Sequence, residues 1–320
     1  MKKKTKVILI VSWVVLFLVV FIVSALLRVS YLGSAPMKLI AVKWDDTVGK
    51  TYSNLEYENN CSHKYDLYIP NGLDVNKNQS LILYIHGGSF NSGSKEDGAA
   101  WCKYYATKGY IAATLDYSLQ TKQKDASLLI MDKEIDNCVN AIYGKCKSLG
   151  YEVTGMATCG VSAGGTLAMN YAFIEKDFKI PVRFVFQLAA PADFEPSDWD
   201  ILKKKNKWKT DAEFATNMTG TEITTEMINS GEYTQYINKI SPARLVSDKT
   251  PPVLCGYGLR DHLVPSHLKF KLTEAFDKYG IQYDYIAFPK SNHGMYSDLD
   301  IMQKFIDKSL EYCVRYFIEK

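Results

Sequence analysis

Short apolar runs alternate with longer segments of helical periodicity along most of this chain. The predicted strands are 64–70, 81–86, 110–117, 155–160, 182–190, 252–258 and 283–288. The predicted helices are 95–108, 126–148, 163–175, 266–279 and 298–318. Most of the runs are continuous and bounded by turn residues, which is typical of strands covered on both faces. The run 64–70 instead alternates apolar with polar residues, which predicts one buried face. Strands alternating with helices predict an α/β fold with a mostly parallel central sheet and helices on both faces.

Residues 193 to about 250 interrupt this alternation. A stretch of about 55 residues between two strands is too long for a plain loop, and this one is polar, charged and rich in aromatic residues. We expect a small, mainly helical insertion that forms a cap over the site. Its aromatic rings either line an apolar acyl or aryl pocket or form the insertion's own core; they belong to Trp199, Trp208, Phe214, Tyr233 and Tyr236.

The N-terminal stretch has the character of a membrane element. Residues 7–27 contain no charged side chain, and as a helix they would span about 31 Å, close to the hydrocarbon thickness of a bilayer. This length favours a retained transmembrane signal anchor, with a cleaved signal and secretion, or a buried core helix, as the alternatives. The lysines of residues 1–6 predict a cytoplasmic tail and a body outside the cytoplasm. We expect a linker over 28–45 and a globular domain over 46–320.

Composition argues against several functions. The net charge is only +3 and the basic residues are spread along the chain, so no nucleic-acid partner is expected. The seven cysteines contain no Cys-x-x-Cys pair, which argues against structural zinc and against a disulfide-dense scaffold. No cluster of histidines, cysteines and carboxylates indicates a metal, so we expect neither metal nor cofactor. The oligomeric state stays open.

A serine stands where a predicted strand meets a predicted helix. Ser162 is flanked by Gly160 and Gly164, which gives the pattern Gly-x-Ser-x-Gly in the strand–turn–helix context that this pattern requires. The glycines keep side chains out of the crowded turn, and the helix that follows directs its first N–H groups at the site. We therefore interpret Ser162 as a candidate nucleophile, which needs a base to accept its proton.

A histidine and an aspartate follow later strands. Among five histidines, His293 lies in a polar loop after the last predicted strand, from which it can reach the central strands, and we predict that it is the base. Asp261 follows another predicted strand and is the candidate carboxylate that fixes the histidine tautomer. Asp298 and Asp300, expected on the last helix, are its rivals. The order Ser162, Asp261, His293 is a known order for such a triad.

The sequence His-Gly-Gly-Ser-Phe follows a predicted strand and offers backbone donors. The N–H groups of Gly87, Gly88 and Ser89 can face a ligand there, and together with the N–H of Ala163 they would form an oxyanion hole. We expect His86 to be structural and to hold this loop through hydrogen bonds.

Together these motifs resemble the α/β-hydrolase superfamily and, within it, the hormone-sensitive-lipase-like esterases and related carboxylesterases. The resemblance covers about 64–318 and rests on His86–Phe90, Asp116–Tyr117, Gly160–Gly165, Ser241–Pro242, Gly258–Pro265 and His293–Gly294. It implies a sheet of the eight-stranded type, the triad Ser162–His293–Asp261 and hydrolysis of carboxylic esters through an acyl-enzyme.

The sequence departs from the family pattern in two places that shape the pocket. Ser89 stands where the family often has a third glycine, but only its N–H is needed. The segment after Asp116–Tyr117 lacks the usual arginine and proline-rich loop, and the usual N-terminal cap helices are missing. The substrate is therefore open, with a small-molecule or polysaccharide-linked ester expected.

Two other functions remain open. A serine peptidase of the prolyl-oligopeptidase kind has a similar catalytic domain, including the Gly-x-x-Asp-x-x-Val-Pro segment seen at 258–265. Such enzymes normally carry a large additional domain before it, which the segment ahead of residue 64 is too short to form. A non-catalytic binding protein on the same fold is the other alternative, because fold alone does not determine function.

Overall fold

The computed structural model describes residues 11–24, 36–58, 63–120, 126–265 and 267–317. Within them, eight strands form one sheet in the order β1-β2-β4-β3-β5-β6-β7-β8. The pairs β1–β2 and β2–β4 are antiparallel, and every other pair is parallel. The predicted α/β fold with a mostly parallel sheet is therefore confirmed.

The predicted strands and helices are all present, with their ends shifted by a few residues. The strands are β1 (Gly49–Glu56), β2 (Lys64–Pro70), β3 (Asn78–Ile85), β4 (Ile111–Leu115), β5 (Glu152–Val161), β6 (Val182–Leu188), β7 (Val253–Gly258) and β8 (Tyr283–Phe288). The helices against the sheet are η1 (Lys95–Gly98), α2 (Ala99–Ala106), α3 (Leu128–Ser148), α4 (Ala163–Phe173), α10 (Leu268–Tyr279) and α11 (Leu299–Tyr316). Of the strands that the structure describes, only β1 had not been predicted.

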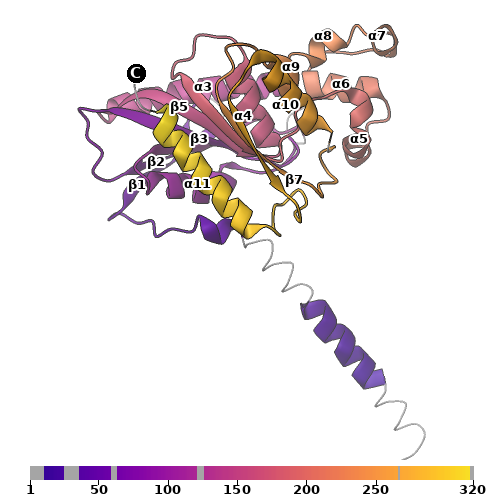
Figure 1. Cartoon of the computed structure of the whole chain (residues 1–320), viewed down its shortest axis with the longest axis horizontal. Helices are drawn as coiled ribbons and strands as arrows, with labels where there is room; N and C mark the ends of the chain where they lie inside the picture. Colours follow the sequence, from indigo (N-terminus) through magenta and orange to yellow (C-terminus); the bar gives the residue numbers. More distant parts are fainter. Residues whose placement is uncertain (1–10, 25–35, 59–62, 121–125, 266, 318–320) are drawn as a thin grey trace, which may run out of the picture.

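Helices cover both faces of the sheet (Figure 1). One core cluster contains buried side chains of α3, α4 and α10, among them Ile135, Leu167 and Leu272. The second contains buried side chains of α2 and α11, among them Tyr105 and Phe305. This double covering explains why β3 to β7 have nearly continuous apolar sequences.

Strand β2 differs from its prediction, because both of its faces are buried. Asp66, on the face expected to meet solvent, is 6% exposed and pairs with the buried ammonium of Lys95 at 3.1 Å. Tyr68 on the same face makes an edge-to-face contact with Trp44, with ring centroids 5.9 Å apart. An ion pair and an aromatic contact therefore cover the face of β2 that was expected to meet solvent.

The insertion between β6 and β7 consists of short helices. They are η2 (Pro196–Asp198), α5 (Asp200–Asn206), α6 (Asp211–Thr219), α7 (Thr225–Ser230), α8 (Thr234–Ile237) and α9 (Pro242–Leu245). Trp199 stacks on Phe194 at 5.5 Å and on Phe214 at 6.4 Å, and all three are buried. These rings therefore form mainly the insertion's own core, and Trp199 also borders the site.

Only part of the N-terminal stretch can be described. Residues 11–24 are helical and their large apolar side chains are exposed. The basic tail 1–6 and both ends of the predicted span 7–27 lie outside the described residues. None of the described helices combines the length and apolar character needed to cross a membrane. Within the predicted linker 28–45, Ile40 is fully buried against the body.

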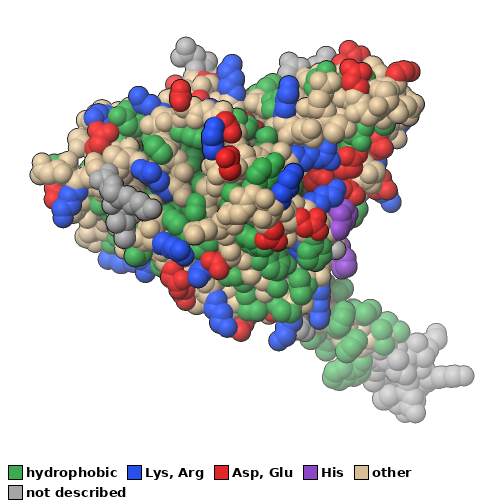
Figure 2. All heavy atoms as spheres, turned by 45° about the horizontal axis from the view of Figure 1, so that its top comes forward, with side chains coloured by type: hydrophobic (Ala, Val, Ile, Leu, Met, Phe, Trp, Pro, Cys, Tyr) green, Lys and Arg blue, Asp and Glu red, His purple; other side chains and the backbone are tan. Residues whose placement is uncertain are grey.

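Charged side chains of both signs are mixed on the face that Figure 2 shows, and the described cysteines are free thiols. On the face shown in Figure 2, basic and acidic side chains are interspersed, without a large area of either sign. Six cysteines are described, and all are buried free thiols: Cys102, Cys138, Cys146, Cys159, Cys255 and Cys313. Cys61 lies outside the described residues.

Candidate active site

Ser162 occupies a tight turn between β5 and α4. Its φ is +56°, a left-handed conformation that serine seldom adopts. Its N–H donates to the carbonyl of Leu188 at 2.8 Å. A Cβ on Gly164 would lie 2.0 Å from the carbonyl oxygen of Ile85, and one on Gly160 would lie 2.5 Å from that same atom. Both glycines are therefore required by close backbone packing, which holds the serine side chain out at the sheet edge.

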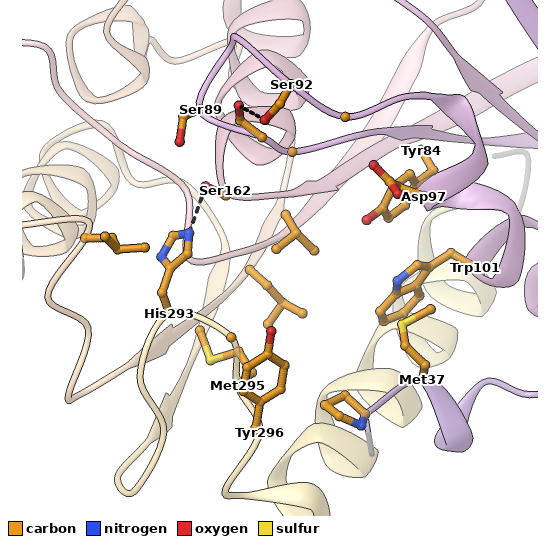
Figure 3. Close-up of a pocket in the computed structure, with 18 of the residues that line it drawn as sticks. Met37, Tyr84, Ser89, Ser92, Asp97, Trp101, Ser162, His293, Met295 and Tyr296 are labelled. Carbon is orange, nitrogen blue, oxygen red and sulfur yellow. Dashed lines mark hydrogen bonds between the residues drawn. The ribbon is translucent and has the colours of Figure 1, made fainter. Parts of the chain in front are cut away.

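His293 connects the serine to an aspartate. Its Nε2 lies 2.8 Å from the Oγ of Ser162, and its Nδ1 lies 2.7 Å from the Oδ2 of Asp261. Figure 3 shows the first of these bonds at the edge of a cavity. The three residues follow β5, β7 and β8, at the carboxyl ends of parallel strands. The structure thus brings all three candidate catalytic residues together.

The Asp261 carboxylate is held in its ionised form. Burial alone would raise the pKa of this group, but the hydrogen bond from His293 and the N–H groups of Leu263 and Val264 hold it below the ordinary value. Those N–H groups donate to Oδ1 at 2.8 and 3.1 Å, which leaves Oδ2 for the imidazole. An ionised carboxylate in this position stabilises an imidazolium and fixes the tautomer that accepts a proton at Nε2.

The rival carboxylates lie elsewhere. Asp298 accepts hydrogen bonds from the N–H of Lys290 at 2.9 Å and from the hydroxyl of Ser291 at 2.7 Å. It therefore braces the loop that carries His293 and makes no hydrogen bond to the imidazole. Asp300 is exposed in the first turn of α11.

His86 supports the glycine loop, as expected. Its ring is 1% exposed, its Nδ1 lies 2.7 Å from the carbonyl of Gly87, and it stacks on Tyr117 with centroids 4.1 Å apart. Burial lowers the pKa of His86, so the neutral ring donates from Nδ1. The Tyr117 hydroxyl in turn donates to the carbonyl of His86 at 2.8 Å.

The remaining histidines have other surroundings. His63 is buried beside Glu58, with its Nδ1 2.6 Å from a carboxylate oxygen. His267 pairs with Asp198 at 3.0 Å, and His262 is exposed. None of them borders the cavity at the serine.

The glycine loop after β3 presents free backbone donors beside the serine. Gly88 and Ser89 have positive φ, +114° and +56°. A Cβ on Gly87 would lie 2.7 Å from the carbonyl of Val161, so the loop packs directly on the serine turn. Within the described part of the chain, the N–H groups of Gly88, Ser89 and Ala163 donate to no other group. Such unpartnered donors suit an oxygen atom that gains negative charge.

Two cavities meet at the serine and the histidine. The large arm has a volume of about 550 Å³, and the small arm has about 60 Å³. The large arm is bordered mainly by apolar groups, with Tyr84, Asp97 and Trp101 at one end. The small arm is lined by the insertion, including Trp199 and Lys205. The two arms that meet at Ser162 and His293 therefore differ in size.

Several pocket residues had not been predicted. Lys205 approaches the oxyanion loop, with its Nζ 3.3 Å from the Oγ of Ser89. Tyr84 precedes His86 by two positions, and the alternation of side chains along a strand is a signal that could have placed it beside the site. Met37 also lines the large arm, and no sequence pattern indicates this. No group of three or more metal-binding side chains occurs among the residues that can be described.

The fold and this site define the class of protein. A mostly parallel eight-stranded sheet, with a serine at a strand–helix elbow and a histidine and an aspartate after later strands, is the arrangement of an α/β-hydrolase. The model of the BD-FAE family matches residues 65–276, and the chain belongs to this family of α/β-hydrolase esterases. The prediction of a serine hydrolase acting on esters is thereby confirmed.

Solved structures share this fold across most of the chain. A truncated carbohydrate esterase from gut microbiota is 16% identical with a TM-score of 0.66, covering 86% of this chain and 100% of that one. Esterase B from Lactobacillus rhamnosis is 16% identical with a TM-score of 0.66, covering 93% and 95%. The butyrate-bound esterase Est2 from Thermogutta terrifontis is 19% identical with a TM-score of 0.64, covering 83% and 94%.

One curated protein matches a shorter stretch. A kynurenine formamidase from Salmo salar is 26% identical over 123 residues. The match spans 38% of this chain and 38% of that protein.

Proposed function

We propose that this chain is a carboxylesterase that works through a Ser162–His293–Asp261 triad and an acyl-enzyme. The observation that carries the proposal is the continuous hydrogen-bonded line from Ser162 Oγ through both ring nitrogens of His293 to Asp261. In the first step, Ser162 attacks the ester carbonyl while Nε2 of His293 takes its proton. Asp261 orients the imidazole and balances the charge of the imidazolium.

The carbonyl oxygen of the substrate becomes an oxyanion during this attack. The N–H groups of Gly87, Gly88, Ser89 and Ala163 are its candidate donors, and Gly87 also packs the loop against the serine turn. Each donor of this kind contributes about 3–4 kcal/mol to lowering the barrier. His293 then gives its proton to the departing alcohol. A water molecule, activated by the same imidazole, releases the acyl group and restores the serine.

The test is turnover by the full-length chain in mild detergent. The substrates are p-nitrophenyl acetate, butyrate, octanoate and palmitate, with matched p-nitroanilides that report peptidase-like amide cleavage. Ser162→Ala is expected to lose at least about 10³-fold in kcat/KM on esters. Ser148→Ala, an exposed position on α3, is the matched control and should retain full turnover.

The outcomes separate the three functions. Serine-dependent hydrolysis of esters with little cleavage of anilides supports the carboxylesterase. Preferential cleavage of anilides would replace it with the peptidase. A folded wild-type chain that turns over neither series would overturn the proposal in favour of a binding protein.

We also propose that residues 7–27 anchor the chain in the membrane, with the catalytic domain outside the cytoplasm. The support is the uncharged length of that stretch and the lysines before it. The test is expression in cells, followed by carbonate extraction and by protease treatment of intact cells. An anchored chain stays in the membrane pellet and is digested from outside. A shortened chain in the medium, identified by its N-terminal mass, would indicate cleavage and secretion.

A further inference from the structure

The side of the large arm opposite His293 carries three side chains with hydrogen-bonding groups. Tyr84, Asp97 and Trp101 lie together there, across the cavity from His293 (Figure 3). We call these three side chains the polar end. Tyr84 comes from β3, Asp97 from η1 and Trp101 from α2. Three separate elements thus bring hydrogen-bonding groups to one end of a cavity whose other walls are mainly apolar.

Two of these side chains are buried and lack partners. Tyr84 is 6% exposed and Trp101 is 7% exposed. The hydroxyl of Tyr84 and the indole N–H of Trp101 make no hydrogen bond to any residue that the structure describes. Among the described residues, neither atom belongs to the fully buried polar atoms that lack a partner, so both atoms reach the open cavity, where water or a ligand can pair with them. Both groups border the cavity, so a ligand in the large arm is the partner that they are placed to meet.

The third group is a carboxylate. Asp97 accepts a hydrogen bond from the N–H of Ser94 at 3.2 Å through Oδ2, which leaves Oδ1 for another donor. Burial is the main cause that raises the pKa of Tyr84, and the Asp97 charge adds to it. The tyrosine is therefore a neutral hydroxyl, able to donate, in any ordinary assay buffer.

The two donors and the carboxylate of the polar end favour an uncharged ligand group that both accepts and donates hydrogen bonds. The two donors need an acceptor oxygen, whereas the carboxylate needs a donor and repels anions. Trp101 also stacks with Tyr84 and with Tyr105, with ring centroids 6.2 and 6.3 Å apart, and these contacts hold its ring in place. A lone ammonium would leave both donors unpaired, and a carboxylate would face Asp97. A neutral hydroxyl or carboxamide satisfies both kinds of group.

We propose that the polar end is a substrate subsite for a neutral hydroxyl or carboxamide group, separated from the scissile ester by an apolar spacer. The spacer lies along the apolar part of the large arm, which includes Leu188, Met295 and Met302. This subsite rests on the proposed carboxylesterase function and specifies its substrate: an ester with one small half and one long half that ends in a polar, uncharged group.

The experiment compares esters that differ only at the remote end. A p-nitrophenyl alkanoate series, from heptanoate to decanoate, is made with a terminal methyl, a terminal hydroxyl, a terminal carboxamide or a terminal carboxylate. The same four ends are placed on the alcohol of acetate esters, so that either half of the substrate can enter the large arm. The full-length enzyme is expected to prefer hydroxyl or amide over methyl by about 10-fold in kcat/KM at one chain length. The carboxylate should be the poorest.

Three variants assign the preference to the subsite. Tyr84→Phe, which removes one donor, should reduce the preference by about 3- to 10-fold. Tyr104→Phe is the matched control, because Tyr104 is equally buried on α2 but does not line the cavity. The side chain of Asp97 is exposed, and Asp97→Asn keeps its size but removes its charge. This variant should improve turnover of the carboxylate ester relative to the hydroxyl ester.

The results distinguish the subsite from the catalytic proposal. A wild-type enzyme that hydrolyses p-nitrophenyl acetate but shows no preference for a polar end in either series overturns the subsite alone. A preference that survives both Tyr84→Phe and Asp97→Asn, or that falls equally in Tyr104→Phe, overturns it as well. Absence of all ester turnover overturns the carboxylesterase function itself.

Discussion

The Nε2 of His293 lies 2.8 Å from the Oγ of Ser162, although the two residues are 131 positions apart in the chain. The sheet explains this proximity. Ser162 follows β5 and His293 follows β8, and the parallel pairing of β5, β6, β7 and β8 brings the carboxyl ends of these strands to one edge. Ligand sites of open α/β sheets lie at this edge. The fold therefore supplies the geometry that the proposed reaction needs.

Asp261→Asn should leave the fold intact and reduce kcat/KM on esters by about 10²- to 10⁴-fold. An asparagine cannot balance the imidazolium charge, and its amide can hold His293 in the wrong tautomer. Initial rates on p-nitrophenyl butyrate measure the loss, and circular dichroism checks the fold. The control is Asp298→Asn, whose side chain braces the loop without contacting His293. A larger loss in the control than in Asp261→Asn would contradict the assignment of the carboxylate.

Gly164→Ala should destabilise the protein by about 3 kcal/mol or more and abolish turnover. Its new methyl group would stand 2.0 Å from the carbonyl oxygen of Ile85, so the backbone of the serine turn must move. Gly144→Ala is the opposite case, because nothing lies within 4 Å of a Cβ at this position on α3. That variant should gain about 0.5–1 kcal/mol through helix propensity. Urea unfolding measures both, and equal stability of the two variants would contradict the account.

Asp132→Asn should stabilise the protein at alkaline pH but not at acid pH. The Asp132 carboxyl is buried in α3, and neither oxygen has a hydrogen-bond partner among the described residues. Burial raises its pKa from 3.8 to about 8. The folded state therefore holds a proton that the unfolded state releases, so the wild-type protein loses stability as pH rises from about 4 to about 8.

The difference in free energy of unfolding between Asp132→Asn and the wild-type protein should grow over that pH range and reach about 1–3 kcal/mol above pH 8. Urea unfolding at pH 5 and at pH 8.5 measures it. Asp177→Asn, at an exposed carboxyl, is the control and should show no such pH dependence. A stability difference that does not change with pH would refute the assignment of this burial effect to Asp132.

Much of the candidate site could be predicted because its residues follow recognisable strands. Ser162, Asp261 and His293 each come after an apolar run, and parallel strands carry such positions to a common edge. The two glycines around the serine reflect a steric demand that is visible in the sequence. The lining of the large arm could not be predicted in this way. Trp101 has the sequence character of any core residue of a helix, and only the packing of α2 places it at the cavity.

The fold was predictable where periodicity is simple, and less so at the antiparallel end of the sheet. Strand β1 escaped prediction because its register shifts between Tyr52 and Leu55, with Asn54 at a φ of +56°. Such an irregularity breaks the alternation on which strand prediction depends. The exposed face assigned to β2 was wrong for another reason: Lys95, distant in sequence, neutralises Asp66 inside the protein. Sequence alone does not identify that partner.

The central claim is that Ser162 is the nucleophile, and covalent labelling tests it most directly. The full-length protein is incubated with a fluorophosphonate probe, and the adduct is located by peptide mass spectrometry. The account predicts one adduct per chain, on Ser162, formed in parallel with loss of ester turnover and absent from Ser162→Ala. An adduct on another residue, or full inhibition of turnover with Ser162 unmodified, would contradict it.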